Sequence, residues 1–550
     1  MIQIMKRYIT LAVIAILFQA GAFAQQDNLP SRSMTIEGNY NPSMTNAEKI
    51  LPVPAKQKNV KEQAVVNYLT DPNPFKQSKR APMMAFSEKS DNIEADSLYG
   101  IVKFGYGIRN LHDGMLDMGW LMSSRDAVRL SGLMGAWASE ITDGWKSRMF
   151  DGDLTADYRH RFDAMNLKVA LSYGHSHYNF REGTKMTDAI RAASNLMLET
   201  NRFKGSLALS GKISDISLQG SAGVEWLSRD GLKVNGKERN NRETLARVNA
   251  VATIPLGFGT AGLEYRQKTA LYDWTSLTDK EYKNYTTFTL SPYWNITSGE
   301  MQASLGANID IRTGSGKPFL ASPMLRFAYS IKRFTLHAAI TGGLEEYDIR
   351  ALDRISPYWA DDEMIKDGYT LYNAGAGVSF SSGTWFNIDL MAGFRHTIDE
   401  AFQMTWDNNI FVSSLIRQQT VDVFYGHMDM DMQFSDRTLV RMDITYNNYL
   451  NRFRDGKMEL KPALDANVYG KFNLARGLDA MLSYRLMLFN SLNGKAMPAV
   501  NDLSLTVNYD LTRNISLYAE GRHLMGGDFY YYAGYRCIKP SVLAGITYRF

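Results

Sequence analysis

Residues 541–550 at the end of the chain read SVLAGITYRF and decide the fold class. Successive side chains of a β-strand point to opposite faces of the sheet, so every second residue lies on the same face. In this segment one face is wholly apolar and ends on the last residue of the sequence: Val542, Ala544, Ile546, Tyr548 and Phe550. The segment therefore predicts a terminal β-strand with one side in an apolar environment.

The same alternation runs through the chain from Leu98 onward. Clear examples lie in residues 386–395, 428–434, 478–488 and 503–510. Many of the runs last about ten residues, whereas an ordinary strand has about five or six. About ten residues are needed to cross a bilayer at a tilt. Strand length therefore favours an all-β, transmembrane antiparallel β-barrel over a soluble β-sandwich.

The connections between the runs come in two sizes. Short polar turns are expected at 213–215, 435–437, 475–477 and 512–514, and longer loops at 181–191, 229–242 and 351–368. Short turns on the periplasmic side that alternate with longer loops are typical of outer-membrane barrels. Counting the runs predicts about 22 strands, with a range of about 18 to 26. The first run, residues 102–108, is expected to pair with the final strand, which closes the sheet and removes its edges.

The amino terminus predicts a secretory signal peptide over residues 1–24. Two basic residues open it, an apolar run covers residues 9–18, and small residues follow. Cleavage is expected at the small-x-small pattern of Ala22 and Ala24, which makes Gln25 the new terminus. The apolar run is too short to span a bilayer as a helix, which disfavours the alternative of a membrane anchor.

Composition changes sharply near residue 97. Residues 25–97 hold seven of the fifteen prolines, none of the nine tryptophans and many lysines. Such a segment cannot bury enough apolar surface to fold alone, so we expect it to be disordered or loosely ordered. The sequence thus divides into the signal peptide, a periplasmic or lumenal Pro/Lys-rich extension at 25–97, and an outer-membrane barrel at 98–550.

Overall composition narrows the class of protein further. The 61 basic and 57 acidic residues give a net charge of +4, which offers no argument for nucleic-acid binding. The single cysteine, Cys537, cannot form an internal disulfide. Beyond the signal peptide no apolar stretch is long enough for a transmembrane helix, yet aromatic residues reach 12%. An exported chain of this kind is either a large secreted all-β protein or a barrel that hides its apolar residues in alternation.

The closing strand resembles the assembly signal of Gram-negative outer-membrane proteins, a terminal strand that ends in Phe. The resemblance implies that the barrel-insertion machinery reads the apolar face from Val542 to Phe550 as an added strand. Residues 514–523, Tyr530 to Tyr532 and the closing strand together look like the barrel end of TonB-dependent receptors. The similarity is close over the last hairpin and general over the rest of the barrel. The expected strand number also sits near the 22 of that family, whose wide lumen is plugged.

The sequence departs from that family before the barrel. The family carries a folded plug domain of well over 100 residues, and only about 70 residues are available here. Residues 36–42 and 46–54 show neither glycine-rich plug motifs nor an energy-coupling box, and are similar to the start of short, plug-less barrels given the same family label. Energised uptake therefore does not follow from the label. The extension either lies in the lumen, contacts a periplasmic partner or serves as a tether.

Few residues suggest chemistry. His175 and His177 share one strand face at a spacing that suits two metal ligands, but a strand facing water gives the same pattern, and we favour that interpretation. The loop 353–367 holds Tyr358, Trp359 and three acidic residues that would suit a calcium or carbohydrate site. There we favour a solvated external loop. No metal, cofactor or catalytic residue is predicted, and no nucleophile stands out, so the chain is not expected to be an enzyme.

Charged residues on the wet face of the wall would set solute preference if the barrel conducts: Lys103, Arg395, Asp429 and Asp431. The leading hypothesis is an outer-membrane barrel of TonB-dependent-receptor type, in contact with lipid, that binds or passes a solute at the cell envelope. The alternative is a structural or assembly component whose extension docks a periplasmic or lipoprotein partner.

Overall fold

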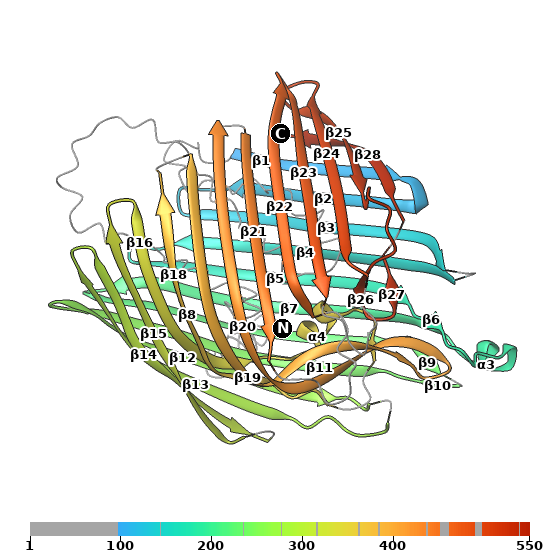
Figure 1. The fold of residues 1–550 in the computed structure, drawn as a ribbon, viewed down its shortest axis with the longest axis horizontal. Coiled ribbons are helices and arrows are strands. Elements are labelled where there is room, and N and C mark those ends of the chain that lie inside the picture. Colours follow the sequence, from blue (N-terminus) through green and yellow to red (C-terminus); the bar gives the residue numbers. More distant parts are fainter. Residues whose placement is uncertain are drawn as a thin grey trace, which may run out of the picture.

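The computed structural model describes residues 97–550 apart from 143–144, 235, 277, 315–316, 361–363, 383–384, 436–437, 451–460, 490–497 and 538. The expected signal peptide with Ala22 and Ala24, and the extension as far as residue 96, lie outside the described residues. In the described part, 22 antiparallel strands form one closed barrel (Figure 1). No helix among the described residues combines the length and apolarity that a membrane crossing requires.

Each wall strand pairs with its neighbours along the chain, as the alternation predicted. In chain order the wall strands are β1 (Ser97–Gly107), β2 (Leu111–Leu121), β3 (Asp126–Thr142), β4 (Trp145–Arg161), β5 (Met165–Asn179), β7 (Met197–Ile213), β8 (Ile216–Asp230), β11 (Asn241–Leu256), β12 (Gly259–Asp273), β13 (Tyr285–Ser298), β14 (Met301–Thr313), β15 (Phe319–Ile331), β16 (Phe334–Glu345), β18 (Gly368–Ser381), β19 (Phe386–Asp407), β20 (Phe411–Ser435), β21 (Thr438–Tyr449), β22 (Pro462–Ala475), β23 (Leu478–Phe489), β24 (Val500–Asp510), β25 (Ile515–Arg522) and β28 (Ser541–Arg549).

Smaller elements lie in the connections, all but one of them in the longer loops at one end of the barrel. They are the 3-10 turn η2 (Ile108–Asn110), β6 (Arg181–Glu182), α3 (Asp188–Ala192), β9 (Lys233–Val234), β10 (Lys237–Glu238), α4 (Ile349–Ile355), β17 (Trp359–Ala360), β26 (Tyr530–Tyr532) and β27 (Tyr535–Arg536). The turn η2 joins the first two wall strands directly.

The barrel closes where β1 meets β28, and this confirms the predicted pairing of the first and last runs. Phe104 lies opposite Ile546, and the two strands stay in antiparallel register from Ile101 to Gly107. The amide of Gly100 also donates to the carbonyl of Phe550 at 2.9 Å. Closure gives every wall strand two hydrogen-bonded neighbours. Strands can cross lipid only when their backbone N–H and C=O groups are paired in this way.

The wall is apolar outside and polar inside. On β1 and β28, large apolar side chains on one face are about half exposed: Val102, Phe104, Tyr106, Val542, Ile546 and Tyr548. Lys103, from the opposite face of β1, instead points into the barrel and pairs with Asp113 at 3.4 Å. The same alternation continues around the ring, so the predicted outer apolar band and wet inner face are both present.

The two ends of the barrel differ, as expected. At the end where β1 begins and β28 stops, neighbouring strands are joined by turns of two to four residues, such as 214–215 and 476–477. At the other end the connections include 180–196, 346–367 and 523–540. We call these the turn end and the loop end.

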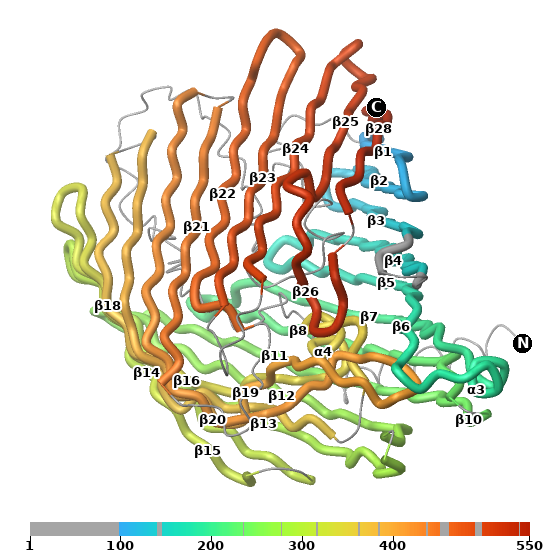
Figure 2. The backbone as a smooth tube through the Cα atoms, turned by 45° about the vertical axis from the view of Figure 1, so that its right-hand side comes forward, coloured from blue at the N-terminus to red at the C-terminus, as the bar shows by residue number. Residues whose placement is uncertain are grey.

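Two strands are much longer than the rest. β19 has 22 residues and β20 has 25, whereas their neighbours β18 and β21 have 14 and 12. The extra length projects at the loop end, and Figure 2 shows β19 and β20 bending away from the wall toward β6.

Candidate functional site

The candidate site lies at the loop end, where one hairpin leaves the wall. β19 pairs with β18 only as far as Ile398, and β20 pairs with β21 only from Val423 onward. Residues 400–419 continue as a two-stranded hairpin, set off from the wall by a bulge between Thr397 and Glu400. We call residues 400–419 the crossing hairpin.

The tip of the crossing hairpin reaches the opposite wall. Residues 411–412 pair antiparallel with residues 181–182 of β6, and the amide of Gly183 donates to the carbonyl of Ile410 at 2.8 Å. β6 follows β5, the fifth wall strand, whereas β20 is the sixteenth of 22, so the two stand half a ring apart. The hairpin therefore spans the loop end from wall to wall (Figure 2).

The loop 346–367 packs along the crossing hairpin. Its strand β17 pairs in parallel with β20, with Trp359 opposite Ser414. The amide of Ser414 donates to the carbonyl of Tyr358 at 2.8 Å, and the hydroxyl of Ser356 donates to the Ser414 hydroxyl at 2.8 Å. This loop thus extends the two-stranded hairpin into a small sheet inside the barrel.

The loop 523–540 holds the hairpin through its own β26–β27 turn. The hydroxyl of Tyr535 donates to the carbonyl of Val412 at 2.5 Å, and the Ser414 hydroxyl donates to the carbonyl of Ala533 at 2.9 Å. The side-chain oxygen of Gln403 accepts from the Ala533 amide at 3.1 Å. We call the crossing hairpin and the loops 180–196, 346–367 and 523–540 the loop cap.

An aromatic cluster fills the loop cap. Eight of its buried rings come from four separate segments: Tyr178, Phe180, Tyr358, Phe411, Phe529, Tyr531, Tyr532 and Tyr535. The rings of Tyr358 and Tyr535 stack with their centroids 3.7 Å apart. Burial raises the pKa of both hydroxyls, so they remain neutral hydrogen-bond donors. A buried aromatic core of this size shows that the loops pack against one another as one layer.

A second set of contacts fixes Trp359, which is 1% exposed. Its ring stacks on Trp274 with the centroids 6.2 Å apart, and the guanidinium carbon of Arg229 lies 4.3 Å from the centre of the Trp359 ring. The indole nitrogen donates to Asp353 at 2.8 Å. Arg229 belongs to β8, so this residue ties the loop 346–367 to the wall.

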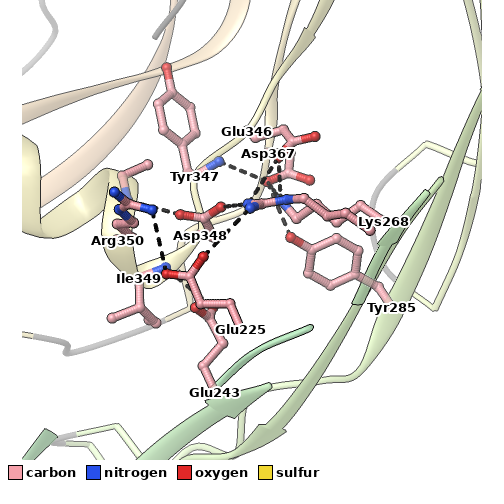
Figure 3. Close-up of polar contacts among 12 residues, drawn as sticks. Glu225, Glu243, Lys268, Tyr285, Glu346, Tyr347, Asp348, Ile349, Arg350 and Asp367 are labelled. Atoms are coloured by element: carbon pink, nitrogen blue, oxygen red, sulfur yellow. Dashed lines mark hydrogen bonds and ion pairs between the residues drawn. The ribbon is translucent and has the colours of Figure 1, made fainter. Parts of the chain in front are cut away.

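A buried ion cluster also links that loop to the wall (Figure 3). From the loop, Glu346, Asp348 and Asp367 face basic residues of β11, β12 and β14. The closest contacts are Arg247 with Asp348 and with Glu346 (3.3 Å), Lys268 with Glu346 (3.4 Å) and with Asp367 (3.5 Å), and Arg312 with Asp367 (3.4 Å).

Hydrogen bonds complete the ion cluster. Tyr285 donates to Asp367 at 3.3 Å, and the amide of Ile349 at the start of α4 donates to Glu243 at 3.2 Å. Burial alone raises the pKa of Asp348, but the charges of Arg247 and Lys268 outweigh burial and hold that pKa at about 2. Buried ion pairs of this kind fix geometry more than they add stability, because desolvation offsets much of their attraction.

These contacts correct the expectation for the loop 353–367. We expected a solvated external loop, but Tyr358 and Trp359 are buried within the barrel mouth. The acidic residues 361–363 lie outside the described residues, so the calcium or carbohydrate alternative is not tested there. The error arises because a loop gives no periodic signal, and the burial of this one depends on partners far away in the sequence.

The histidine pair of β5 lies on the outer face. His175 and His177 follow Leu171 and Tyr173, which are exposed on the lipid side, at the same alternation. His175 bonds to Asn201 at 2.8 Å, and the ring of His177 stacks on Phe150 at 5.6 Å. The wall therefore presents this pair at its outer surface, near the end of β5 that leads into the loop 180–196.

The four predicted lumenal charges do point inward, and each has a partner. Lys103 pairs with Asp113, Arg395 with Glu400 (2.8 Å), Asp429 with His427 (2.8 Å) and Asp431 with Arg441 (2.5 Å). Glu400 begins the crossing hairpin, so Arg395 supports the bend as well as lining the lumen.

Sequence reasoning missed a Cys–His–Asp group near the loop cap. The sulfur of Cys537 lies 3.5 Å from Nδ1 and 3.7 Å from Nε2 of His523, and Asp502 contacts Nδ1 at 3.0 Å. In a hydrolase triad the base faces the nucleophile with one ring nitrogen and the carboxylate with the other. Here the sulfur is nearly equidistant from the two nitrogens and slightly closer to the one that Asp502 contacts, so it does not face Nε2 alone as a triad nucleophile does.

Comparison with known proteins finds likeness in structure only. No family model matches the sequence, and no curated protein does. The crystal structure of the siderophore receptor PirA from Acinetobacter baumannii aligns with a TM-score of 0.64 at 13% identity, over 83% of this chain and 81% of that chain. A variant of the ferric enterobactin receptor PfeA from Pseudomonas aeruginosa gives 0.63 at 12%, over 83% and 81%. The copper transporter OprC gives 0.62 at 11%, over 84% and 81%.

The chain has the barrel fold of TonB-dependent receptors. This confirms the resemblance of the closing hairpin, and the fold with its apolar outer band places the chain in the outer membrane. The described residues contain no plug domain; they contain the barrel wall and its loops. The neighbours are receptors and transporters, not enzymes, and two of their structures are named for complexes with pyocin S2 and with enterobactin.

Proposed function

We propose that the chain is an outer-membrane barrel that binds or passes a polar solute, and that the crossing hairpin is its gate. One observation carries the proposal: residues 400–419 span the loop end and pair with the opposite wall through residues 181–182. A 22-stranded barrel is wide enough to need filling. The loop cap supplies that filling from the barrel's own loops.

The contacts that hold the gate support a reversible closure. They are hydrogen bonds, ring stacking and ion pairs, and none of them is covalent. A scaffold without transport would gain little from a lumen lined with paired charges such as Arg395 with Glu400 and Arg485 with Asp465. Charged walls favour polar or ionic solutes over apolar ones.

The proposal does not assign a reaction. The neighbouring structures are receptors and transporters, and the sulfur of Cys537 lies slightly closer to the His523 nitrogen that Asp502 contacts than to Nε2, which does not favour hydrolysis at the only Cys. We therefore propose that the chain is not an enzyme and uses no cofactor.

Two partner roles remain proposals. The barrel-insertion machinery is expected to read the outer face of β28, from Val542 to Phe550, during assembly. Residues 25–96 lie outside the described residues, so their place in the lumen, or as a dock for a periplasmic or lipoprotein partner, stays a prediction. The role of a structural or assembly component rests on that segment alone.

The test shortens the gate in the full chain. Ala401 and Gln418 are direct register partners, so a two-residue Asn-Gly turn can join them in place of residues 402–417. We expect planar-bilayer recordings of the wild type to be quiet and those of the shortened protein to show stepwise conductance. A matched control replaces Asp188–Ala192 of α3, which buries no residue, by a Gly-Ser linker of equal length. A folded shortened barrel that stays as quiet as the control would contradict the proposed gate.

A further inference from the structure

The inner wall carries three carboxylates side by side on three consecutive strands. Asp389 of β19 lies directly opposite Asp429 of β20, and Asp429 lies directly opposite Asp443 of β21. All three lie on the lumenal face, because Leu390 and Tyr446 on the alternate face are exposed to the outside. Like charges directly opposite each other destabilise a sheet. The arrangement therefore calls for a positive partner.

The wall does not supply that partner as a permanent cation. In the described part of the chain, no Lys or Arg lies at ion-pair distance from Asp389, Asp429 or Asp443; the nearby Arg441 and Arg485 pair with Asp431 and Asp465 instead. One oxygen of Asp443 is buried and accepts no hydrogen bond. Buried carboxylate oxygens without a donor are costly, which distinguishes this group from ordinary solvated acids.

Histidine side chains complete the group. His427 is almost fully buried; its Nε2 lies 2.8 Å from Asp429, and its Nδ1 lies 3.0 Å from the Thr445 hydroxyl and 3.9 Å from Asp443. With the Nδ1 proton donated to the Thr445 hydroxyl, Nε2 carries the lone pair and faces Asp429, a tautomer assigned from these contacts. A neutral histidine whose other nitrogen is held by a hydrogen-bond partner is the usual form of a metal ligand.

The donor atoms of this group are close enough to share one ion. One atom each from His427, Asp429 and Asp443 lies within 4.8 Å of the others. Ligand atoms around tetrahedral Zn²⁺ lie about 3.3 Å apart, given bonds of about 2.0–2.1 Å. The 2.8 Å between Nε2 of His427 and Asp429 falls short of that spacing by only about half an ångström. Small side-chain rotations therefore suffice to bring the three donors onto an ion.

We propose that His427, Asp429 and Asp443 form a lumenal binding site for a divalent first-row transition-metal ion of the Zn²⁺ type. One imidazole and two carboxylates suit such ions, whereas Ca²⁺ and Mg²⁺ prefer all-oxygen sites. Asp389, held by His337 at 2.8 Å, stands next to the site and adds negative potential. Three ligands leave a coordination position open toward the lumen.

The site is reachable from the lumen and independent of the gate. The side chains of Asp429 and Asp443 are 38% and 23% exposed, on wall strands below the loop cap. An ion bound there would meet any solute that moves along this side of the wall. Zn²⁺ binding is measured on the wild-type barrel with its gate in place. Absence of binding would therefore not contradict the proposed gate, and absence of gating would not contradict the proposed metal site.

The experiment titrates the full-length, untagged barrel in detergent with Zn²⁺ by calorimetry after removal of bound metal with a chelator. We expect one ion per barrel for the wild type. The variants Asp443→Asn and His427→Gln should bind Zn²⁺ at least about tenfold more weakly. Removing even a hydrogen-bond partner of a metal ligand lowers metal affinity by about that factor. Co²⁺ in place of Zn²⁺ should give visible absorption bands in the wild type that both variants lose.

The matched control is His160→Gln. His160 also contacts a carboxylate, Asp126 at 2.7 Å, but no second acid stands beside it, so Zn²⁺ affinity should not change. Asp443→Asn keeps the shape of the side chain, so a loss of binding there cannot be a loss of fold when its heat-modifiable migration matches that of the wild type. Absence of binding by the wild type, or equal affinity in the wild type, Asp443→Asn and His427→Gln, would overturn the proposal.

Discussion

Phe411, at the tip of the crossing hairpin, is the antiparallel partner of Glu182 in β6, although the strands that carry these two segments stand half a ring apart. The loop end of this barrel is therefore crossed by its own backbone. β6 and β17 both pair with the edge of β20 that β19 leaves free, so in this part of the hairpin β20 has hydrogen-bonded neighbours on both sides, as it would in a sheet. This relationship distinguishes a packed closure from loops that merely cover an opening.

Truncating Phe411 should loosen the loop cap. Phe411 is fully buried in the aromatic cluster, and removing a buried aromatic ring costs about 3–5 kcal/mol. The lone thiol, Cys537, packs against the same cluster and reports on its opening. We expect maleimide to label Cys537 at least about tenfold faster in Phe411→Ala than in the wild type, since each 1.4 kcal/mol is a factor of ten. Phe258→Ala, at an exposed turn-end site, should leave the labelling rate unchanged; equal rates in both variants would contradict the packing described for Phe411.

Acid should release the loop 346–367. The pKa of Asp348 is about 2 in the folded protein and 3.8 without the cluster, so its contribution is complete above about pH 4 and is lost as the pH falls through 2. Trp359 should then leave its buried stack, and its fluorescence should shift to the red between pH 4 and 2. The difference spectrum between wild type and Trp359→Phe isolates this signal. Asp348→Asn should abolish the pH dependence, and an unchanged transition in that variant would rule out Asp348 as the titrating group.

Removing the basic partner should have a larger effect. Arg247→Met leaves Asp348, Glu346 and Glu225 without their shared cation, and breaking a buried ion pair in this way costs roughly 3–5 kcal/mol. We expect trypsin to cleave at Arg350 and Arg354 in this variant and to spare the wild type. The control is Arg191→Met, which breaks the solvent-exposed pair with Glu182 and should not change cleavage. Resistance of Arg247→Met to trypsin would show that the ion cluster does not hold the loop.

The ring of Phe550 should matter more for insertion into the outer membrane than for the pairing of β1 with β28 that closes the barrel. Phe550→Ala keeps the two backbone hydrogen bonds with Gly100 and removes only the ring that stacks near Tyr548. If the insertion machinery reads that ring, the yield of heat-modifiable barrel in the outer membrane should fall severalfold. Phe434→Ala removes a ring that is exposed on the outer wall and should assemble normally. Normal yield of Phe550→Ala would refute the assembly signal predicted for β28.

The wall was predictable because its signal is local. Alternation places Val102 and Ile546 on the lipid side whatever their neighbours are, and the bilayer imposes one strand length on every segment. The pairing of β1 with β28 followed from the need to leave no edge, not from any contact visible in the sequence. The count of 22 strands rested on the same repeated pattern.

The loop cap was not predictable from the sequence, because its contacts join distant segments. Tyr358 meets Tyr535 only after the barrel has brought the two loops to one end. Asp407-Asn408-Asn409 is a clear turn, but nothing in the sequence marks its hairpin as leaving the wall, because alternation continues through it. His427 and Asp443 are likewise sixteen positions apart in sequence and become neighbours through strand register alone.

Disulfide cross-linking tests the crossing hairpin most directly. Arg181 and Val412 are register partners in an antiparallel pair, whose Cα atoms lie about 4.5–5.5 Å apart, within the range that a disulfide needs. In a Cys537→Ala background, Arg181→Cys with Val412→Cys should cross-link on oxidation to the same extent as the wall pair Ser483→Cys with Ser504→Cys, which are opposite each other in β23 and β24. Each cysteine alone should give no cross-link. Efficient cross-linking of the wall pair with none between positions 181 and 412 would contradict a hairpin that spans the barrel.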